Sequence, residues 1–171
     1  MIGKLKDLIT NGIFAYTGRL AIDTDNNNPR PDYPYYSYKI TSIKTNANGE
    51  GNYIDSFPES TEEGFKHDYV ESVELQPQVI VSFNAYSQDI AECINKISQA
   101  WDYFKHAGKK RFADENIVIV RVMNITDRTV VMGERYEYRY GFDVEFRILH
   151  TIERRSETIE EFKFNKKGNV K

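Results

Sequence analysis

The longest alternating run of the chain, residues 136–152, constrains its fold more than any other segment. Aromatic and aliphatic side chains alternate there with charged or small ones, which is the pattern of a strand with one covered face. Seventeen residues at ~3.3 Å each would span about 55 Å, whereas an ordinary strand has about five or six residues. We therefore expect part of this strand to project and pair outside the compact body, or the strand to bend at Gly141.

The other periodic segments predict an α+β fold. Helices are expected at residues 2–13 and from an N-cap at Ser87 to Gly108, and strands at 20–22, 36–45, 78–86 and 117–125. The apolar start of 117–125 predicts a central strand covered on both sides, or an interior strand at an interface. We expect a single mixed, mostly antiparallel sheet, with a long amphipathic helix and an N-terminal helix packed on it, plus an extended β-hairpin.

The length of 171 residues fits a single domain over residues 1–171. Glycine, asparagine and acidic residues predict a flexible excursion at 46–64. One last short element is expected around Ile159, Phe162 and Phe164, followed by a frayed tail at 165–171.

Charge and composition exclude several classes of protein. A net charge of −3 argues against a protein whose main task is to grip phosphate backbones. The lone Cys93 cannot form an internal disulfide, which favours a reducing compartment. No apolar run approaches the ~20 residues of a membrane helix, and no signal peptide is visible, so we expect a soluble protein without a membrane partner.

The charge is unevenly distributed. Residues 50–74 hold eight acidic residues and one basic residue, a net charge of −7 that leaves about +4 on the rest of the chain. This pattern has two interpretations, a solvated face and a functional surface.

The candidate catalytic and metal-ligating residues form no recognisable site, so we expect no enzyme activity, no cofactor and no metal. The three histidines, His67, His106 and His150, are scattered, and Cys93 adds no ligand pair. Residues 23–34 begin like a calcium loop but lack its glycine and its final glutamate. Residues 139–146 have the aromatic spacing of an RNA-recognition strand. However, Asp143, a carboxylate, stands where such a strand has a small residue.

Two segments carry a family resemblance. Residues 27–40 resemble the proline-rich loop and aromatic strand of the neck or tail terminator proteins of tailed bacteriophages, and residues 133–146 are similar to the long C-terminal strand of that family. The residues that carry the resemblance, and that are expected at subunit interfaces, are Pro29, Arg30, Pro31, Pro34, Tyr35, Tyr38, Arg135, Tyr138, Arg139, Phe142 and Asp143.

The resemblance implies a ring, commonly a hexamer, that closes the phage tail tube and docks it to the head connector. DNA would pass through without specific binding, in a protein found in the virion and, during assembly, in the host cytoplasm. An acidic lumen or docking face would then be formed by Glu59, Glu62, Glu63, Asp68 and Glu71. The alternatives are another head–tail connector subunit, a tail tube subunit, and a single-stranded nucleic-acid-binding module.

Overall fold

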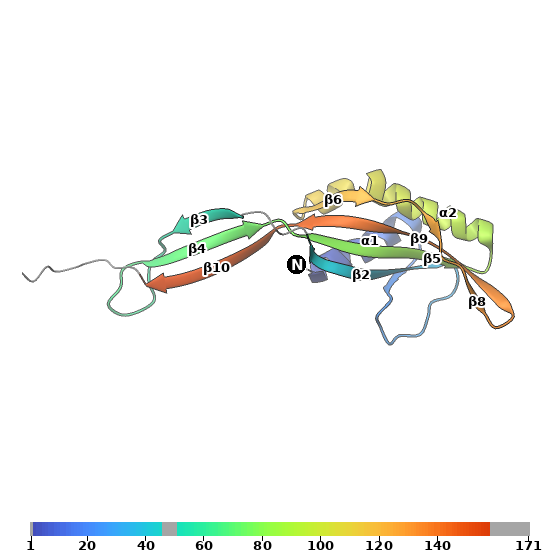
Figure 1. The fold of residues 1–171 in the computed structure, drawn as a ribbon, viewed down its shortest axis with the longest axis horizontal. Helices are drawn as coiled ribbons and strands as arrows, with labels where there is room; N and C mark the ends of the chain where they lie inside the picture. Colours follow the sequence, from blue (N-terminus) through green and yellow to red (C-terminus); the bar gives the residue numbers. More distant parts are fainter. Residues whose placement is uncertain (1, 46–50, 158–171) are drawn as a thin grey trace, which may run out of the picture. The chain divides into compact units, whose positions relative to one another are not determined.

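The computed structural model describes residues 2–45 and 51–157, which form two compact units. Within these ranges, unit 1 comprises residues 2–45 and 76–150, and unit 2 comprises residues 51–75 and 151–157. The α+β class expected from the sequence is confirmed. Each unit has its own sheet, so a second, small sheet accompanies the main one (Figure 1).

The main sheet belongs to unit 1 and has the strand order β1-β2-β5-β9-β6. Among the described strand pairs only β1/β2 is parallel, and the short strands β7 and β8 also pair with β9, so the sheet is mixed and mostly antiparallel as predicted. The strands are β1 (Ala21–Asp23), β2 (Tyr35–Thr45), β5 (Gln78–Ser87), β6 (Ile117–Val122), β7 (Thr126–Asp127), β8 (Val130–Met132) and β9 (Arg135–Ile148).

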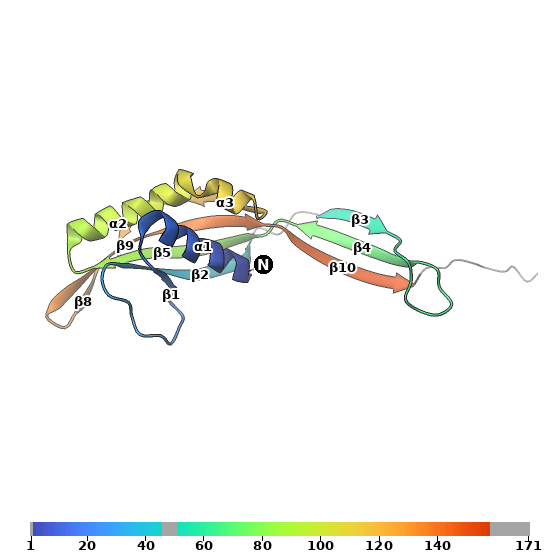
Figure 2. The same cartoon turned by 180° about the vertical axis from the view of Figure 1, so that it is seen from behind.

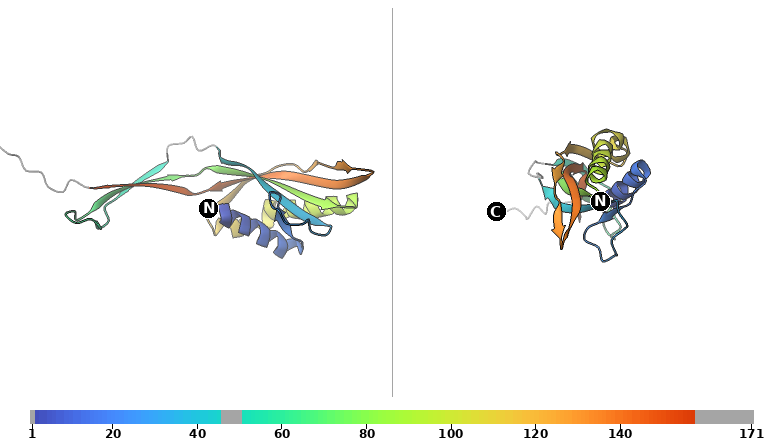
Figure 3. Two further views of the ribbon diagram at one scale, coloured as in Figure 1. Left: turned by 90° about the horizontal axis from the view of Figure 1, so that it is seen from below. Right: turned by 90° about the vertical axis from the view of Figure 1, so that its right-hand side faces the viewer.

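All helices described in unit 1 lie on one face of this sheet (Figures 2 and 3). They are α1 (Ile2–Thr17), α2 (Ile90–Asp102), the π-helical turn η1 (Tyr103–Ala107) and the short α3 (Lys109–Ala113). Alternate residues of β5 and β9 face the helices in register, for example Phe83 opposite Phe142. Phe104 packs edge-on against Phe142 and Phe146, with ring centroids 6.0 and 6.1 Å apart. Each such buried ring contributes about 1.5–3 kcal/mol by leaving water.

The N-cap of α2 is Asp89, so the expectation of Ser87 is wrong. The Asp89 carboxylate accepts a hydrogen bond from the Glu92 backbone N–H at 2.7 Å. Ser87 is the last residue of β5, and its hydroxyl donates instead to the Glu92 carboxylate at 2.5 Å. Both residue types suit an N-cap, and the length of β5 decides between them.

Strand β6 is the last strand of the main sheet, which contradicts the expected central position. Val118 is 51% exposed and Val120 39% exposed, whereas Ile117 and Ile119 face the core. The apolar run therefore has one buried face and one open face.

The long alternating run divides at Leu149, where β9 ends and β10 (His150–Glu157) follows. Pairing with β5 continues through Gly141 without a register shift, so the strand is not broken there. Gly141 is required for a different reason, because a Cβ would lie 2.7 Å from the Phe83 carbonyl oxygen.

Unit 2 contains a three-stranded sheet of order β10-β4-β3, with β3 at Asn52–Ser56 and β4 at Asp68–Leu75. Strands β3 and β4 are antiparallel, with Asn52 opposite Glu74 and Ser56 opposite Val70. A strand thus occupies part of the segment for which the sequence predicts a flexible excursion. Residues 46–50, the expected element at 159–164 and the expected tail at 165–171 lie outside the described residues.

Candidate assembly surfaces

The proline-rich loop, residues 24–34, covers part of the sheet face opposite the helices. Tyr35 and Ser37 point to that face yet are only 4% and 2% exposed. Thr24 lies against this strand, since its hydroxyl hydrogen-bonds the Ser37 hydroxyl at 3.2 Å and donates to the Tyr38 carbonyl at 3.1 Å. The loop, and no helix among the described residues, shields this end of β2 from water.

Two donors from the loop and one from β9 itself, Arg139, bind the carboxylate of Glu137 on β9, which is 5% exposed. Arg30 donates at 2.8 Å, the Tyr33 hydroxyl at 2.5 Å and Arg139 at 3.4 Å. The carboxylate raises the pKa of the Arg30 guanidinium, and burial together with this hydrogen bond raises the pKa of Tyr33. A buried carboxylate needs such partners, because an unpaired one would be costly.

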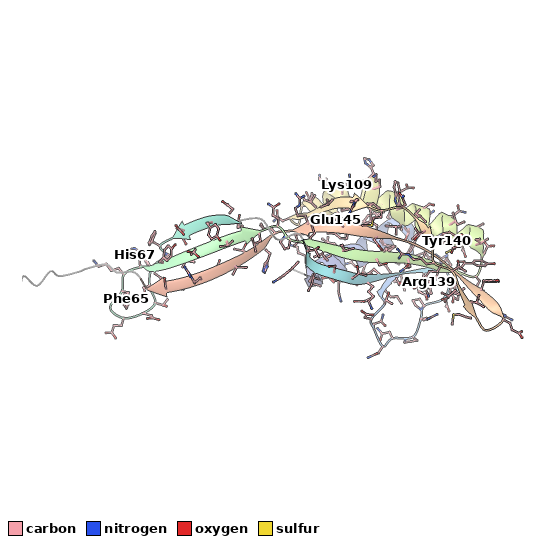
Figure 4. The ribbon with its side chains drawn as sticks, viewed as in Figure 1. Phe65, His67, Lys109, Arg139, Tyr140 and Glu145 are labelled. Atoms are coloured by element: carbon pink, nitrogen blue, oxygen red, sulfur yellow. The ribbon has the colours of Figure 1, made fainter. Side chains whose placement is uncertain are left out.

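Aromatic stacking continues this cluster toward β5. The rings of Tyr35 and Tyr86 are stacked with centroids 4.8 Å apart, and the Arg139 guanidinium lies 4.7 Å from the centre of the Tyr86 ring. Burial raises the pKa of Tyr35 to about 12. We call the cluster of Arg30, Tyr33, Tyr35, Tyr86, Glu137 and Arg139 the clasp (Arg139 is labelled in Figure 4).

Asp143 lies on the same helix-free face, where it is bound by Arg128. The Arg128 guanidinium donates to Asp143 at 3.0 Å, to Ser82 at 2.6 Å and to Asn84 at 2.9 Å. Asp143, which departs from the pattern of an RNA-binding strand, is therefore one partner of an internal ion pair.

The eleven residues that carry the resemblance fall into different environments. Arg30, Tyr35 and Arg139 meet in the clasp, while Tyr38 and Phe142 are buried under the helices, and Tyr138 is half-buried on the same side. Pro29 and Arg135 are exposed and Pro31 is half-buried. Pro34 is buried, and its peptide bond with Tyr33 is cis. The structure thus joins the two segments of the resemblance through Glu137.

A hairpin formed by β8 and the start of β9 presents apolar side chains to solvent. Val131, Met132 and Tyr136 are 65%, 52% and 62% exposed. Beside it lies a pocket of about 500 Å³, lined by Tyr33, Gln88, Met132, Arg135, Tyr136 and Tyr138 among others. An exposed apolar patch next to a hollow is typical of a protein-binding surface.

The sequence predicted an extended β-hairpin but did not single out Glu137 or the exposed apolar side chains of the β8–β9 hairpin. The alternation places Glu137 on the polar face of its strand, but its burial depends on a loop about one hundred residues earlier in the chain. The run Val130-Val131-Met132 was a visible signal of the hairpin.

The acidic candidates of unit 2 are also divided. Glu59, Glu62 and Glu63 are exposed, whereas Asp68 is buried beside Arg155, and Glu71 pairs with Arg154 at 3.1 Å. The Ser60 hydroxyl, with Arg155, holds the pKa of the Asp68 carboxyl below its usual value. Phe65 and His67 lie in the same loop (Figure 4). Only the first three carboxylates remain fully open to a partner.

Among residues 2–45 and 51–157, no group of three or more His, Cys, Asp or Glu side chains is arranged to hold a metal ion. Within the same ranges no helix is both long and apolar enough to cross a bilayer. Burial raises the pKa of the Cys93 thiol, which is fully buried in the core.

Comparison with known proteins gives one family. The model of a family described as "Phage neck terminator protein" matches residues 2–170. No curated protein matches the chain.

Proposed function

The chain belongs to the phage neck terminator protein family, and from that membership we propose that it forms a ring, a hexamer, that closes the tail tube. The ring joins the tube to the head connector. The family is one of structural proteins, which makes this chain a structural protein of the phage neck. The observation that carries the proposal is the family match over residues 2–170, nearly the whole chain.

The exposed surfaces of unit 1 support an assembly role. The β8–β9 hairpin offers Val131, Met132 and Tyr136 beside a pocket that a partner side chain could enter. Aromatic residues, methionine and arginine are enriched in protein interfaces. The partners in this proposal are the tail tube and head-connector proteins.

The clasp and its loop form one of the contact surfaces in this proposal. Pro29, Arg30, Pro31 and Arg135 supply accessible groups, while Pro34 and Tyr35 hold the loop in place from beneath. Tyr38, Tyr138, Phe142 and Asp143 act indirectly, by shaping the strands that carry the surface.

In this proposal the lumen or a docking face is formed by the exposed carboxylates of unit 2, Glu59, Glu62 and Glu63. Asp68 and Glu71 lie on the adjoining strand β4 and contribute by holding it in place. A wall of like charge repels phosphates, so DNA would slide through without specific binding. Replacing the three glutamates with lysine should slow DNA exit from assembled particles, and exit at an unchanged rate would argue against a lumenal position.

The protein would act in the neck of the virion and be present in the host cytoplasm during assembly. The test is to add purified protein to tail tubes that lack a terminator and to image them by electron microscopy. We expect one closed ring at one end of each tube, and tubes that then join to heads. Open stacking into further tube would show a tube subunit instead, and tubes left bare would contradict the proposal.

A further inference from the structure

The described residues of unit 2 form a sheet without a buried apolar core. Every buried apolar side chain described in the structure lies in unit 1, and unit 2 leaves Tyr53 63%, Phe57 60% and Ile152 49% exposed. A small sheet is stable by itself only when three or more strands share a hydrophobic face or when it packs against a helix, and apolar side chains gain stability only when they leave water. Among the described residues unit 2 has no such cover, so another surface would have to supply one.

The edge strands differ in how well they could pair with another chain. Strand β10 is an edge of the unit 2 sheet but carries adjacent charges at Glu153, Arg154 and Arg155, which discourage pairing. The opposite edge, β3, has five residues and a single charge, Asp55. In the main sheet the edge strand β1 has only three residues.

The other edge of the main sheet, β6, has six residues and a single charge, Arg121. A register shift between Ile119 and Arg121 distorts the end of β6, so its regular part is Ile117–Ile119. Among the described edge strands, β3 and β6 are the two that combine five or six residues with a single charge.

The surroundings of these two edges are complementary in charge. Val118 of β6 lies opposite Arg147, and the exposed Lys109 and Lys110 belong to α3, which packs near β6 (Lys109 is labelled in Figure 4). Strand β3 opens a segment, residues 50–74, whose net charge is −7. Apolar side chains occur on both edges, Val118 on β6 and Tyr53 and Ile54 on β3.

We propose that β3 of one subunit docks at the β6 edge of a neighbouring subunit, so that unit 2 is covered by a second copy of this chain. The inference rests on the proposed ring and names its subunit contact. Because β3 and β6 are different surfaces, the contact is head-to-tail, and such contacts close into rings when the rotation per subunit allows it.

Cysteine cross-linking between two variants tests the contact. One variant carries Tyr53→Cys and the other Val118→Cys, and native Cys93 stays because it is buried. Mixed and assembled on tail tubes under mild oxidation, the pair should give a covalent dimer, while either variant alone should not. The matched control replaces Val118→Cys with Phe14→Cys, an equally exposed position on α1.

The outcomes separate this inference from the ring itself. Rings that form on tubes without a 53–118 cross-link, or with equal cross-linking to Phe14→Cys, overturn the β3–β6 contact and leave the ring intact. A double variant carrying both cysteines that cross-links only within one chain also overturns it. Absence of any ring contradicts the proposed function instead.

Charge reversal gives a second, independent readout. Lys109→Glu with Lys110→Glu should weaken subunit association by about tenfold or more at low salt, with a smaller effect at high salt. Arg19→Glu, an exposed charge beyond the end of α1, is the control and should change association little. Equal effects of the two changes would contradict a role for the basic surface beside β6.

Discussion

The Glu137 carboxylate ties a loop to a strand that is more than one hundred residues away in the chain. Glu137→Ala would leave the half-buried Tyr33 and Arg139 groups without this acceptor, and a lost buried partner costs about 1–3 kcal/mol. We expect the free energy of unfolding in urea to fall by roughly that amount. Proteolysis within residues 24–34 should also become faster, as measured by mass spectrometry of the early fragments.

The matched control is Glu134→Ala, at an exposed position in the turn of the same hairpin. It removes the same charge and should leave both stability and cleavage unchanged. If the two variants behave alike, the clasp does not hold the loop.

Gly12 of α1 has no room for a side chain. A Cβ at this position would lie 1.9 Å from the buried Tyr103 hydroxyl, so Gly12→Ala forces the ring or the helix to move. Overpacking of this kind costs about 1–3 kcal/mol, despite the better helix propensity of alanine. Gly3→Ala, in the same helix with nothing within 4 Å of the new Cβ, should be neutral or stabilising by comparison. Urea unfolding of the two variants measures the difference.

The raised pKa of Tyr35 predicts a loss of folding stability at high pH. Its pKa is raised from 10.0 to about 12 by burial, so the unfolded chain releases this proton first. The stabilisation is fully present below pH ~10 and is lost as the pH rises toward about 12. Tyr35→Phe removes this group from the titration, and its stability should fall less between these pH values. Unfolding followed by circular dichroism across this range checks the prediction, and parallel curves for the two proteins would contradict it.

At the scale of elements, local pattern predicted the strands and helices that bury one face. The positions of β2, β5 and α2 follow from alternation or from helical spacing, which a sequence displays directly. The order of strands does not. The four apolar residues at the start of β6 favoured a central strand or an interior strand at an interface, and β6 is an edge of the main sheet with an exposed outer face. The clasp escaped prediction for the same reason, since its loop and strand meet only through the tertiary fold.

The β8–β9 hairpin provides a test of an element whose apolar side chains are exposed to solvent. Val131 is 65% exposed, so Val131→Asp should change the free energy of unfolding by no more than about 0.5 kcal/mol. If the hairpin contacts a partner protein, the new carboxylate at position 131 would be buried in that interface and should strongly reduce incorporation into tails. Thr129→Asp, at a half-buried position before β8 whose hydroxyl bonds β9, should instead lower stability. Normal incorporation of Val131→Asp would remove the hairpin from the assembly surfaces.

At the scale of the whole molecule, core and charge are divided between the two units. Unit 1 holds every buried apolar side chain that the structure describes, and the segment with a net charge of −7 belongs almost entirely to unit 2. That the chain behaves as the single domain expected from its length stays a prediction. It would appear as one cooperative transition seen by probes placed in both units.

Removing unit 2 should convert the protein into an inhibitor of its own assembly. Thr45 and Gln78 are paired across β2 and β5, so a short glycine-serine turn can replace residues 46–75 in a chain that stops at His150. This variant keeps the core and the β6 edge but lacks β3, so it can accept a neighbour and cannot bind the next one.

At roughly one truncated chain in ten, only about half of six-membered rings built at random would contain none of them. The fraction of tubes that join to heads should therefore fall much more steeply than the fraction of truncated chain rises, as counted by electron microscopy. A truncated chain with Val118→Asp, which spoils the β6 edge as well, should not inhibit. A linear fall, or inhibition by both variants, would show that β3 and β6 do not link the subunits.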